Sequence, residues 1–300
     1  MRYICAQPAN QYYGWQINVM IHSFIKNGVN PNHVDIVLAN NIPELDYYKQ
    51  LEIKYPNVNF YYYDDTRVDK FYVSSIRPHI LAKHFELYSN LYKGVFMYHD
   101  CDIALTKPLE INKYLEDDVC YLSDTISYIG YKYIQSKGDD VFQRMVRTFN
   151  INPECVIENE LNSGGAQYIL KDIDSFFWKK VEKDCVQLYK NITAMNLKKK
   201  TLNPDYHELQ IWCSDMWAVL WNLWIFGKQT KVIKELNFTW ATEPSINWNK
   251  NAIFHNAGVI SSKTGLFFKG EYIHKIPPKD LNIDETKASN EYYKLIKEAI

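Results

Sequence analysis

The feature that most constrains the fold is a short apolar segment ending in two acidic residues. Residues 95–98 are apolar and run directly into Asp100 and Asp102, and a second apolar patch covers 103–105. Such a run is typical of a buried strand in an α/β sheet. Side chains two positions apart on a strand face the same way, so both carboxylates are expected together at its carboxyl end. Open α/β sheets bind their ligands at that edge.

The rest of the chain alternates between strand and helix patterns. Strands are predicted at 3–6, 34–39, 58–63, 119–122 and 252–254, with one more ending at Leu170. Helices are predicted at 15–26, 43–55, 73–88, 139–149, 172–190, from 203–205 to beyond 224, and at 284–300. This alternation predicts an α/β fold, with a sheet flanked by helices in a single domain.

Composition and charge exclude several classes of protein. The 300 residues are 47% hydrophobic and carry a net charge of -1, so a large core is expected and a nucleic-acid partner is not. The six cysteines form no Cys-x-x-Cys pair, which argues against structural zinc and for reduced thiols in a cytoplasmic protein. No apolar run is long enough to span a membrane, and residues 2–7 are too short and too polar for a signal peptide.

The acidic pair has the chemistry of a metal site. Carboxylate oxygens suit hard cations such as Mg²⁺ or Mn²⁺, although an acidic surface turn is the alternative for Asp100 and Asp102. His255 follows a predicted strand and is the natural third ligand, because neutral imidazole suits Mn²⁺; a hydrogen-bonded rim histidine is the alternative. His99 should point to the opposite face and is interpreted as structural.

A glycine-containing stretch, 161–170, offers a second group of candidates. Gly164 and Gly165 would let backbone donors approach a ligand closely, and Asn162 and Gln167 carry amides suited to sugar hydroxyls. An ordinary turn before a strand explains the same residues. No Gly-x-Gly-x-x-Gly or Walker-type loop is present, so the usual phosphate cradles are not supported.

Three charged residues are further candidates. Asp215 lies off the apolar face of the predicted long helix, where it could bind hydroxyls or act as a general base; a solvated helix face is the alternative. Arg77 and Lys263 stand in polar turns and could bind a diphosphate, or could be surface charge.

Taken in order, these motifs resemble the GT-A glycosyltransferases, and most of all the glycogenin-like and galactosyltransferase-like branch, over roughly residues 1 to 270. In that family an Asp-x-Asp motif holds Mn²⁺ or Mg²⁺ against a nucleotide-sugar diphosphate, matched here by Asp100 and Asp102. The family's Asn-x-Gly loop at the donor sugar is matched by 162–165, and its late metal-binding histidine by His255, with Gly258 following. The branch's Lys-Pro-Trp is absent: serines stand in its place, and Lys263 comes later.

The resemblance implies one Rossmann-like GT-A domain with a mixed sheet. Residues 1–105 would form the nucleotide-binding half, 106–275 the acceptor half and 276–300 a C-terminal helix. The implied activity moves a sugar, a hexose by expectation, from a nucleotide diphosphate sugar such as a UDP-sugar to a hydroxyl of a glycan or other acceptor. Ala6 and Gln7, where the first strand ends, join the expected nucleotide contacts.

Two other functions stay open at this stage. A nucleotidyltransferase also uses paired carboxylates and metal, but it would normally carry a Gly-rich basic loop near residues 7–14. A non-catalytic sugar-binding protein on the same fold is the second alternative. The sharpest expectation is geometric: Asp102 and His255 should meet across one cation, whereas Asp100 could bind it directly, bind it through water, or hold the ribose.

Overall fold

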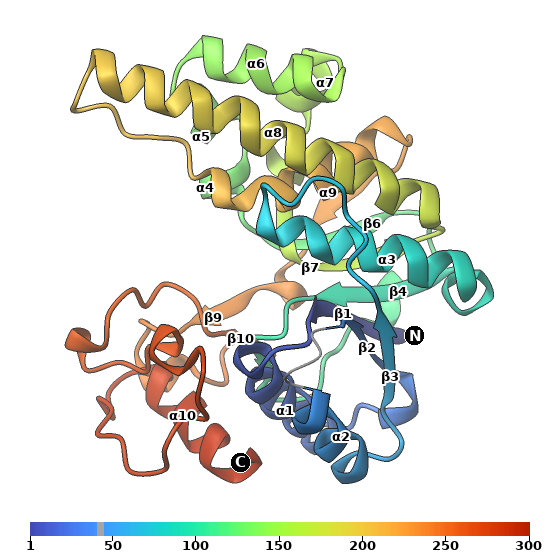
Figure 1. Cartoon of the computed structure of the whole chain (residues 1–300), viewed down its shortest axis with the longest axis vertical. Helices are drawn as coiled ribbons and strands as arrows, with labels where there is room; N and C mark the ends of the chain where they lie inside the picture. The colour runs from blue at the N-terminus through green and yellow to red at the C-terminus, as the bar shows by residue number, and fades with distance from the viewer. Residues whose placement is uncertain (41–44) are drawn as a thin grey trace. The chain divides into compact units, whose positions relative to one another are not determined.

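The computed structural model describes residues 1–40 and 45–300 (Figure 1). Contacts divide the chain into two compact units, each built from separated stretches of sequence. The first unit contains Met1–Asp64, Met97–Leu115 and Glu235–Ile300, and the second contains Asp65–Phe96 and Glu116–Lys234. The assignment of nucleotide and acceptor roles to 1–105 and 106–275 stays a prediction.

The first unit holds parallel strands and a small second sheet. β1 (Arg2–Pro8), β2 (Val34–Ala39) and β3 (Asn59–Tyr63) pair in parallel in the order β3-β2-β1. The second sheet has the order β5-β10-β9, in which β10 (Ile253–His255) is antiparallel to β5 (Ile103–Leu105) and parallel to β9 (Phe238–Trp240).

Helices α1 (Gln11–Lys26), α2 (Leu45–Lys54) and α10 (Ala288–Ala299) belong to the same unit (Figure 1). α1 begins where Asn10 accepts a hydrogen bond from the backbone N–H of Tyr13, as an N-cap does. α1 packs against β5 and α10. The buried residues shared by these elements form one core cluster: Trp15, Val19, Ala104, Ala241, Phe254, Phe267, Tyr272, Ile283, Ala288, Tyr292, Tyr293, Leu295, Ile296 and Ala299.

The second unit holds three strands and most of the helices. β6 (Cys120–Asp124) lies between β7 (Gly164–Lys171), which is antiparallel to it, and β8 (Thr230–Val232), which is parallel. The long helix α8 (Ser175–Leu202) packs against α3 (Ile76–Leu87), α6 (Asp139–Phe149) and α9 (Ser214–Ile225) (Figure 1). Short helices α4 (Ile126–Ile129), α5 (Tyr131–Gln135) and α7 (Pro153–Glu158) complete the unit.

With β4 (Val95–His99), the main sheet has seven strands of mixed direction and is flanked by helices, so the predicted α/β fold with a mixed sheet is confirmed. The boundary between the compact units falls inside β4. All six cysteines are free thiols. Within the described ranges, no helix combines the length and apolar character needed to cross a bilayer.

One predicted helix begins much later than expected. The helix predicted from residues 203–205 starts only at Ser214. The side chain of Asn203 accepts a hydrogen bond from the N–H of Asp205, 3.1 Å away, and this local turn takes the place of a first helical turn. Trp212, predicted to lie on the core face of that helix, is 62% exposed.

Other boundaries also differ. The helix predicted at 172–190 begins at Ser175, because Asp174 caps it by accepting from the N–H of Phe177, and it continues to Leu202. Phe176, expected to face inward, is exposed. The terminal helix begins at Ala288 instead of residue 284, and the start of the helix predicted at 43–55 lies outside the described residues.

Candidate metal centre

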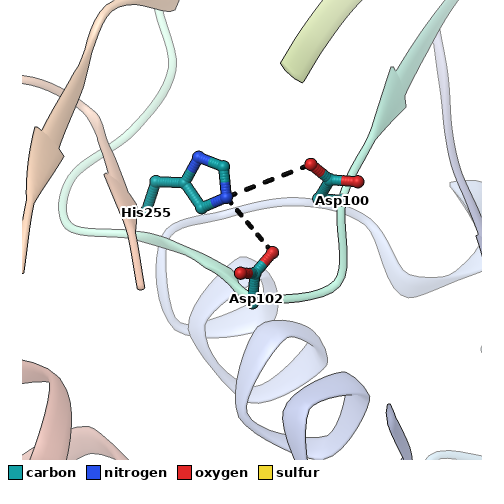
Figure 2. A group of neighbouring side chains, drawn as sticks. All are labelled: Asp100, Asp102 and His255. Carbon is teal, nitrogen blue, oxygen red and sulfur yellow. Dashed lines mark ion pairs between the residues drawn. The ribbon is translucent and has the colours of Figure 1, made fainter. Parts of the chain in front are cut away.

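Three side chains of the first unit converge just beyond the end of β4 (Figure 2). Nε2 of His255 lies 3.3 Å from Oδ1 of Asp102 and 3.9 Å from Oδ2 of Asp100. One potential ligand atom from each residue lies within 4.8 Å of the others. The structure therefore brings together the three residues that the sequence predicted as metal ligands.

The small second sheet explains why residues so distant in sequence meet. In the antiparallel pairing of β10 with β5, His255 lies opposite Ile103, the residue directly after Asp102. The backbone N–H of Asn256 then donates to the carbonyl oxygen of Asp102 at 2.9 Å. Strand register, and not local sequence, thus sets the distance between His255 and the acidic pair.

Aromatic rings fix the orientation of the histidine. The ring of Trp240 lies nearly parallel to that of His255, with 12° between the planes, and Phe238 packs edge-on at a centroid distance of 5.0 Å. Nδ1 of His255 is buried and makes no hydrogen bond within the described part of the chain, so Nε2 is the nitrogen that faces the carboxylates (Figure 2).

A lysine that the sequence motifs did not reveal completes this cluster. Nζ of Lys269 donates to Oδ2 of Asp102. The sequence had pointed instead to Lys263, which lies exposed in the short turn Ser262–Thr264. Lys269 reaches the site because its neighbours Phe267 and Tyr272 are buried in the core, a tertiary effect for which spacing gave no signal.

Charges within the cluster stabilise one another. Burial favours the neutral form of Asp102, but Lys269 and His255 outweigh burial and hold the pKa of this carboxyl far below its ordinary value. Burial likewise opposes the charge of Lys269, but the carboxylate of Asp102 raises the net pKa of this ammonium group above its ordinary value. At neutral pH the pair is therefore an ion pair.

The donor set fits a hard divalent cation. Two carboxylate oxygens and one imidazole nitrogen suit Mn²⁺ or Mg²⁺. Oδ1 of Asp102 is the oxygen that faces His255, while Oδ2 accepts from Lys269. A divalent ion and an ammonium group roughly 4 Å apart repel by about 2 kcal/mol even in bulk water, so Lys269 opposes any metal held here.

The neighbours of the acidic pair behave as predicted or stay untested. His99 is buried beside Tyr3 and Phe24, its Nδ1 lies 2.9 Å from the carbonyl oxygen of Asp100, and burial lowers its pKa to about 4. This buried position agrees with the prediction that His99 has a structural role. Ala6 and Gln7 are buried near the end of β1, where their predicted nucleotide role is not tested.

In the second unit, two candidates bind each other. Arg77 donates to Oδ2 of Asp215, and the hydroxyl of Tyr72 donates to Oδ1 at 2.7 Å. Asp215 is only 6% exposed, so the alternative of a solvated helix face is wrong. Burial first, and then Asp215, raises the pKa of Tyr72 well above its ordinary value, which keeps the hydroxyl a donor.

Most of the glycine-containing stretch, from Gly164 onward, lies within a strand. Gly164 and Gly165 are the first residues of β7, and a Cβ on Gly164 would lie 2.5 Å from Leu122 Cβ and from the carbonyl oxygen of Ser123. The close approach that requires this glycine is therefore to β6 of the same sheet. An Ala at this position would force the two strands apart.

The two amide candidates flank those glycines. Gln167 is fully buried, its Oε1 accepts from the hydroxyl of Ser123 at 2.7 Å, and its Nε2 has no partner among the described residues. Asn162 donates to the side chain of Asn159. The second unit contains both amide candidates, the two glycines, Arg77 and Asp215. The first unit contains Asp100, Asp102, His255 and Lys263.

Comparison with known proteins adds information on the fold. No family model matches the sequence, and no curated protein matches it. The apo structure of the bifunctional glycosyltransferase WbbM aligns with a TM-score of 0.53 at 10% identity over 99% of this chain. The chain spans about half of that protein, 49%.

Two further structures align over most of this chain. The galactosyltransferase LgtC, in complex with donor and acceptor sugar analogues, has a TM-score of 0.47 at 9% identity, with 99% of this chain and 96% of that chain covered. Mouse xyloside xylosyltransferase 1 has a TM-score of 0.42 at 9% identity, with 86% and 99% covered. At this identity the likeness to WbbM concerns the fold alone, and for the fold the predicted GT-A type is confirmed.

Proposed function

We propose that the protein is a metal-dependent glycosyltransferase that moves a hexose from a UDP-sugar to an acceptor hydroxyl. The convergence of Asp100, Asp102 and His255 on a GT-A fold is the observation that carries this proposal. The nucleotide, the sugar and the cytoplasmic location stay predictions. A decayed, non-catalytic relative would have no reason to keep three ligand atoms at this spacing.

The first unit would hold the leaving group. Oδ1 of Asp102 and Nε2 of His255 would hold Mn²⁺ or Mg²⁺, with Asp100 next to them. A bound divalent ion would neutralise charge on the departing diphosphate. The stacking of Trp240 on His255 keeps the imidazole in place, so the chain pre-organises this part of the site.

Two amide side chains are the candidates for contacts to the sugar. We propose that Gln167, through its unpartnered buried Nε2, and Asn162 bind sugar hydroxyls beside Gly164 and Gly165. Asp215 stays the candidate for binding or deprotonating an acceptor hydroxyl. To act as a base it must give up part of its bonding to Arg77 or Tyr72.

A donor panel tests the proposal. The purified protein is incubated with UDP-, GDP- and dTDP-sugars in Mn²⁺ or in EDTA, and released nucleotides and sugars are separated. Metal-dependent release of a nucleoside diphosphate is expected from one donor. In a parallel incubation with nucleoside triphosphates and a sugar 1-phosphate, release of pyrophosphate would indicate a nucleotidyltransferase instead. Binding without turnover of any donor would indicate a sugar-binding protein.

A matched pair of variants assigns the activity to this centre. Asp102→Asn should abolish metal-dependent release. Asp46→Asn should leave it unchanged, because the side chain of Asp46 is 90% exposed. Equal activity in both variants would remove the acidic pair from the mechanism.

A further inference from the structure

Lys269 places a positive charge on the carboxylate that a metal would use. We propose that Lys269 keeps the metal affinity of the free protein low, so that a divalent cation binds tightly only together with a nucleoside diphosphate. This inference rests on the proposed metal role of Asp102. It concerns the order and strength of binding, and not the identity of the sugar or the acceptor.

The contact geometry carries the first step. Nζ of Lys269 binds Oδ2 of Asp102, while Oδ1 of the same carboxylate faces Nε2 of His255 at 3.3 Å. A cation on Oδ1 and the ammonium on Oδ2 would thus share one carboxylate. The two carboxylates and the ammonium together carry a formal charge of about -1. Without the lysine, the acidic pair alone would offer a divalent ion a formal charge of about -2.

The backbone around Lys269 is anchored, so the residue stays within side-chain reach of Asp102. Phe267 is buried, and its N–H donates to the hydroxyl of Ser289 at 2.8 Å. Tyr272 is buried too, and its carbonyl oxygen accepts from Nε1 of Trp15 at 3.1 Å. These contacts fix the backbone on both sides of Lys269, and the ion pair with Asp102 places its ammonium at the carboxylate that a metal would use.

A nucleoside diphosphate would reverse the balance. Its phosphate oxygens would ligate the cation, and its negative charge would at the same time offset the positive charge of Lys269. Metal and diphosphate would then bind cooperatively, because each reduces the unfavourable charge interaction that the other meets when it binds alone. A lysine-free site would bind the metal well by itself and would show much less of this coupling.

Titrations with Mn²⁺ test the inference without any measurement of sugar transfer. Electron paramagnetic resonance of free Mn²⁺ gives its affinity for the wild type, Lys269→Met and Lys269→Arg, with and without saturating UDP. Titration of Mn²⁺ into UDP alone is the blank. Lys49→Met is the matched control, since the side chain of Lys49 is 68% exposed. Thermal unfolding checks that each variant is folded, and Lys269→Gln replaces Lys269→Met if the latter is not.

Without UDP, Lys269→Met should bind Mn²⁺ at least tenfold more tightly than the wild type, and Lys269→Arg and Lys49→Met should match the wild type. With UDP, the difference in Mn²⁺ affinity between Lys269→Met and the wild type should shrink to less than threefold. Equal or weaker Mn²⁺ binding by Lys269→Met without UDP would overturn the inference, because Lys269 would then only orient Asp102. If UDP leaves this difference in affinity unchanged, the proposed coupling between Mn²⁺ and the diphosphate is wrong.

The donor panel separates this result from the proposed function. If the titrations come out as expected while no donor is turned over, the proposed transferase activity fails and the antagonism between lysine and metal stands. If a donor is turned over but Lys269→Met gains no affinity for Mn²⁺, the inference fails alone.

Discussion

Two buried aspartates, one in each compact unit, have the same kind of partner but different surroundings. Asp215 accepts from Arg77 on one oxygen and from Tyr72 on the other. Asp102 accepts from Lys269 on one oxygen, while the other faces His255 with Asp100 close by. The first carboxylate is fully engaged by the protein, and the second still has an oxygen for a ligand.

This difference separates stability from function. A buried ion pair with satisfied oxygens mainly positions its elements, and the loss of one partner is costly. Asp100 and Asp102 together carry more negative charge than Lys269 offsets, and a divalent cation can bind that remaining charge. Burial alone would have ranked Asp215 and Asp102 equally, because they are 6% and 8% exposed. The neighbours of each carboxylate decide its role.

The largest expected effect belongs to Asp102. Asp102→Asn removes the charge that would hold the metal while keeping the shape of the side chain. We expect donor turnover to fall by at least about 10³-fold, as for the loss of a group that stabilises the leaving charge. Turnover of the active donor in Mn²⁺ is the measurement. A fall below tenfold would place the metal elsewhere.

Asp215 should affect stability in addition to its proposed role at the acceptor hydroxyl. Asp215→Ala leaves the guanidinium of Arg77 partly buried without this carboxylate, and we expect unfolding in urea to require about 3 kcal/mol less. Asp46→Ala, at an exposed pair, should change stability by less than about 0.5 kcal/mol. The double variant Arg77→Met/Asp215→Ala should recover part of the loss. A stable Asp215→Ala protein without turnover would make Asp215 catalytic and break the contrast.

Asp100 should have a smaller effect than Asp102. Its Oδ2 is 3.9 Å from His255, against 3.3 Å for Asp102, which fits a weaker or water-mediated contact with the metal. Asp100→Asn should weaken Mn²⁺ binding roughly 10- to 100-fold in the presence of UDP, the range for indirect partners of a metal. Equal losses in Asp100→Asn and Asp102→Asn would show that both bind the metal directly.

The smallest expected effect belongs to a partly exposed ion pair, in which Lys113 is 63% exposed and Glu235 is 15% exposed. Burial opposes the charge of Glu235, but hydrogen bonds from Lys113 and Tyr114 prevail and lower its pKa to about 2. Because the folded pKa lies below the unfolded one, this stabilisation is present above about pH 4.5 and is lost as pH falls toward 2.

The corresponding variant is Glu235→Gln. It should lose less than about 1 kcal/mol at pH 7, and its urea midpoint should approach that of the wild type near pH 2. A difference that grows on acidification would contradict the assigned sign. A loss as large as that of Asp215→Ala would remove the distinction between buried and exposed pairs.

Sequence patterns predicted the elements best where the apolar period was strong. The helix at Asp139–Phe149 matches its prediction, with Val141, Phe142 and Met145 buried as expected. The helix start predicted after Asn203 was wrong. There the side chain of Asn203 forms a turn with the backbone, and the following residues have little apolar content to favour a helix. Local hydrogen bonding of this kind is invisible to periodicity.

The metal centre was partly predictable for the same reason. Asp100 and Asp102 follow a buried strand, and alternation along a strand is a local property that the sequence records. His255 was placed only by resemblance to a family, since its approach depends on the pairing of β10 with β5. Lys269 was missed, because neither spacing nor motif marks a residue delivered by the packing of its neighbours.

By itself, the sequence determined the α/β class of the fold and the acidic strand end, because periodicity and chain order are properties of neighbouring residues. The tertiary structure alone decided which cation meets which carboxylate: Lys269 with Asp102, and Arg77 with Asp215. Charge pairs form between distant segments only after burial has fixed the backbone. The sequence could therefore nominate the acidic pair, while only the fold could show that one of its oxygens already holds a lysine.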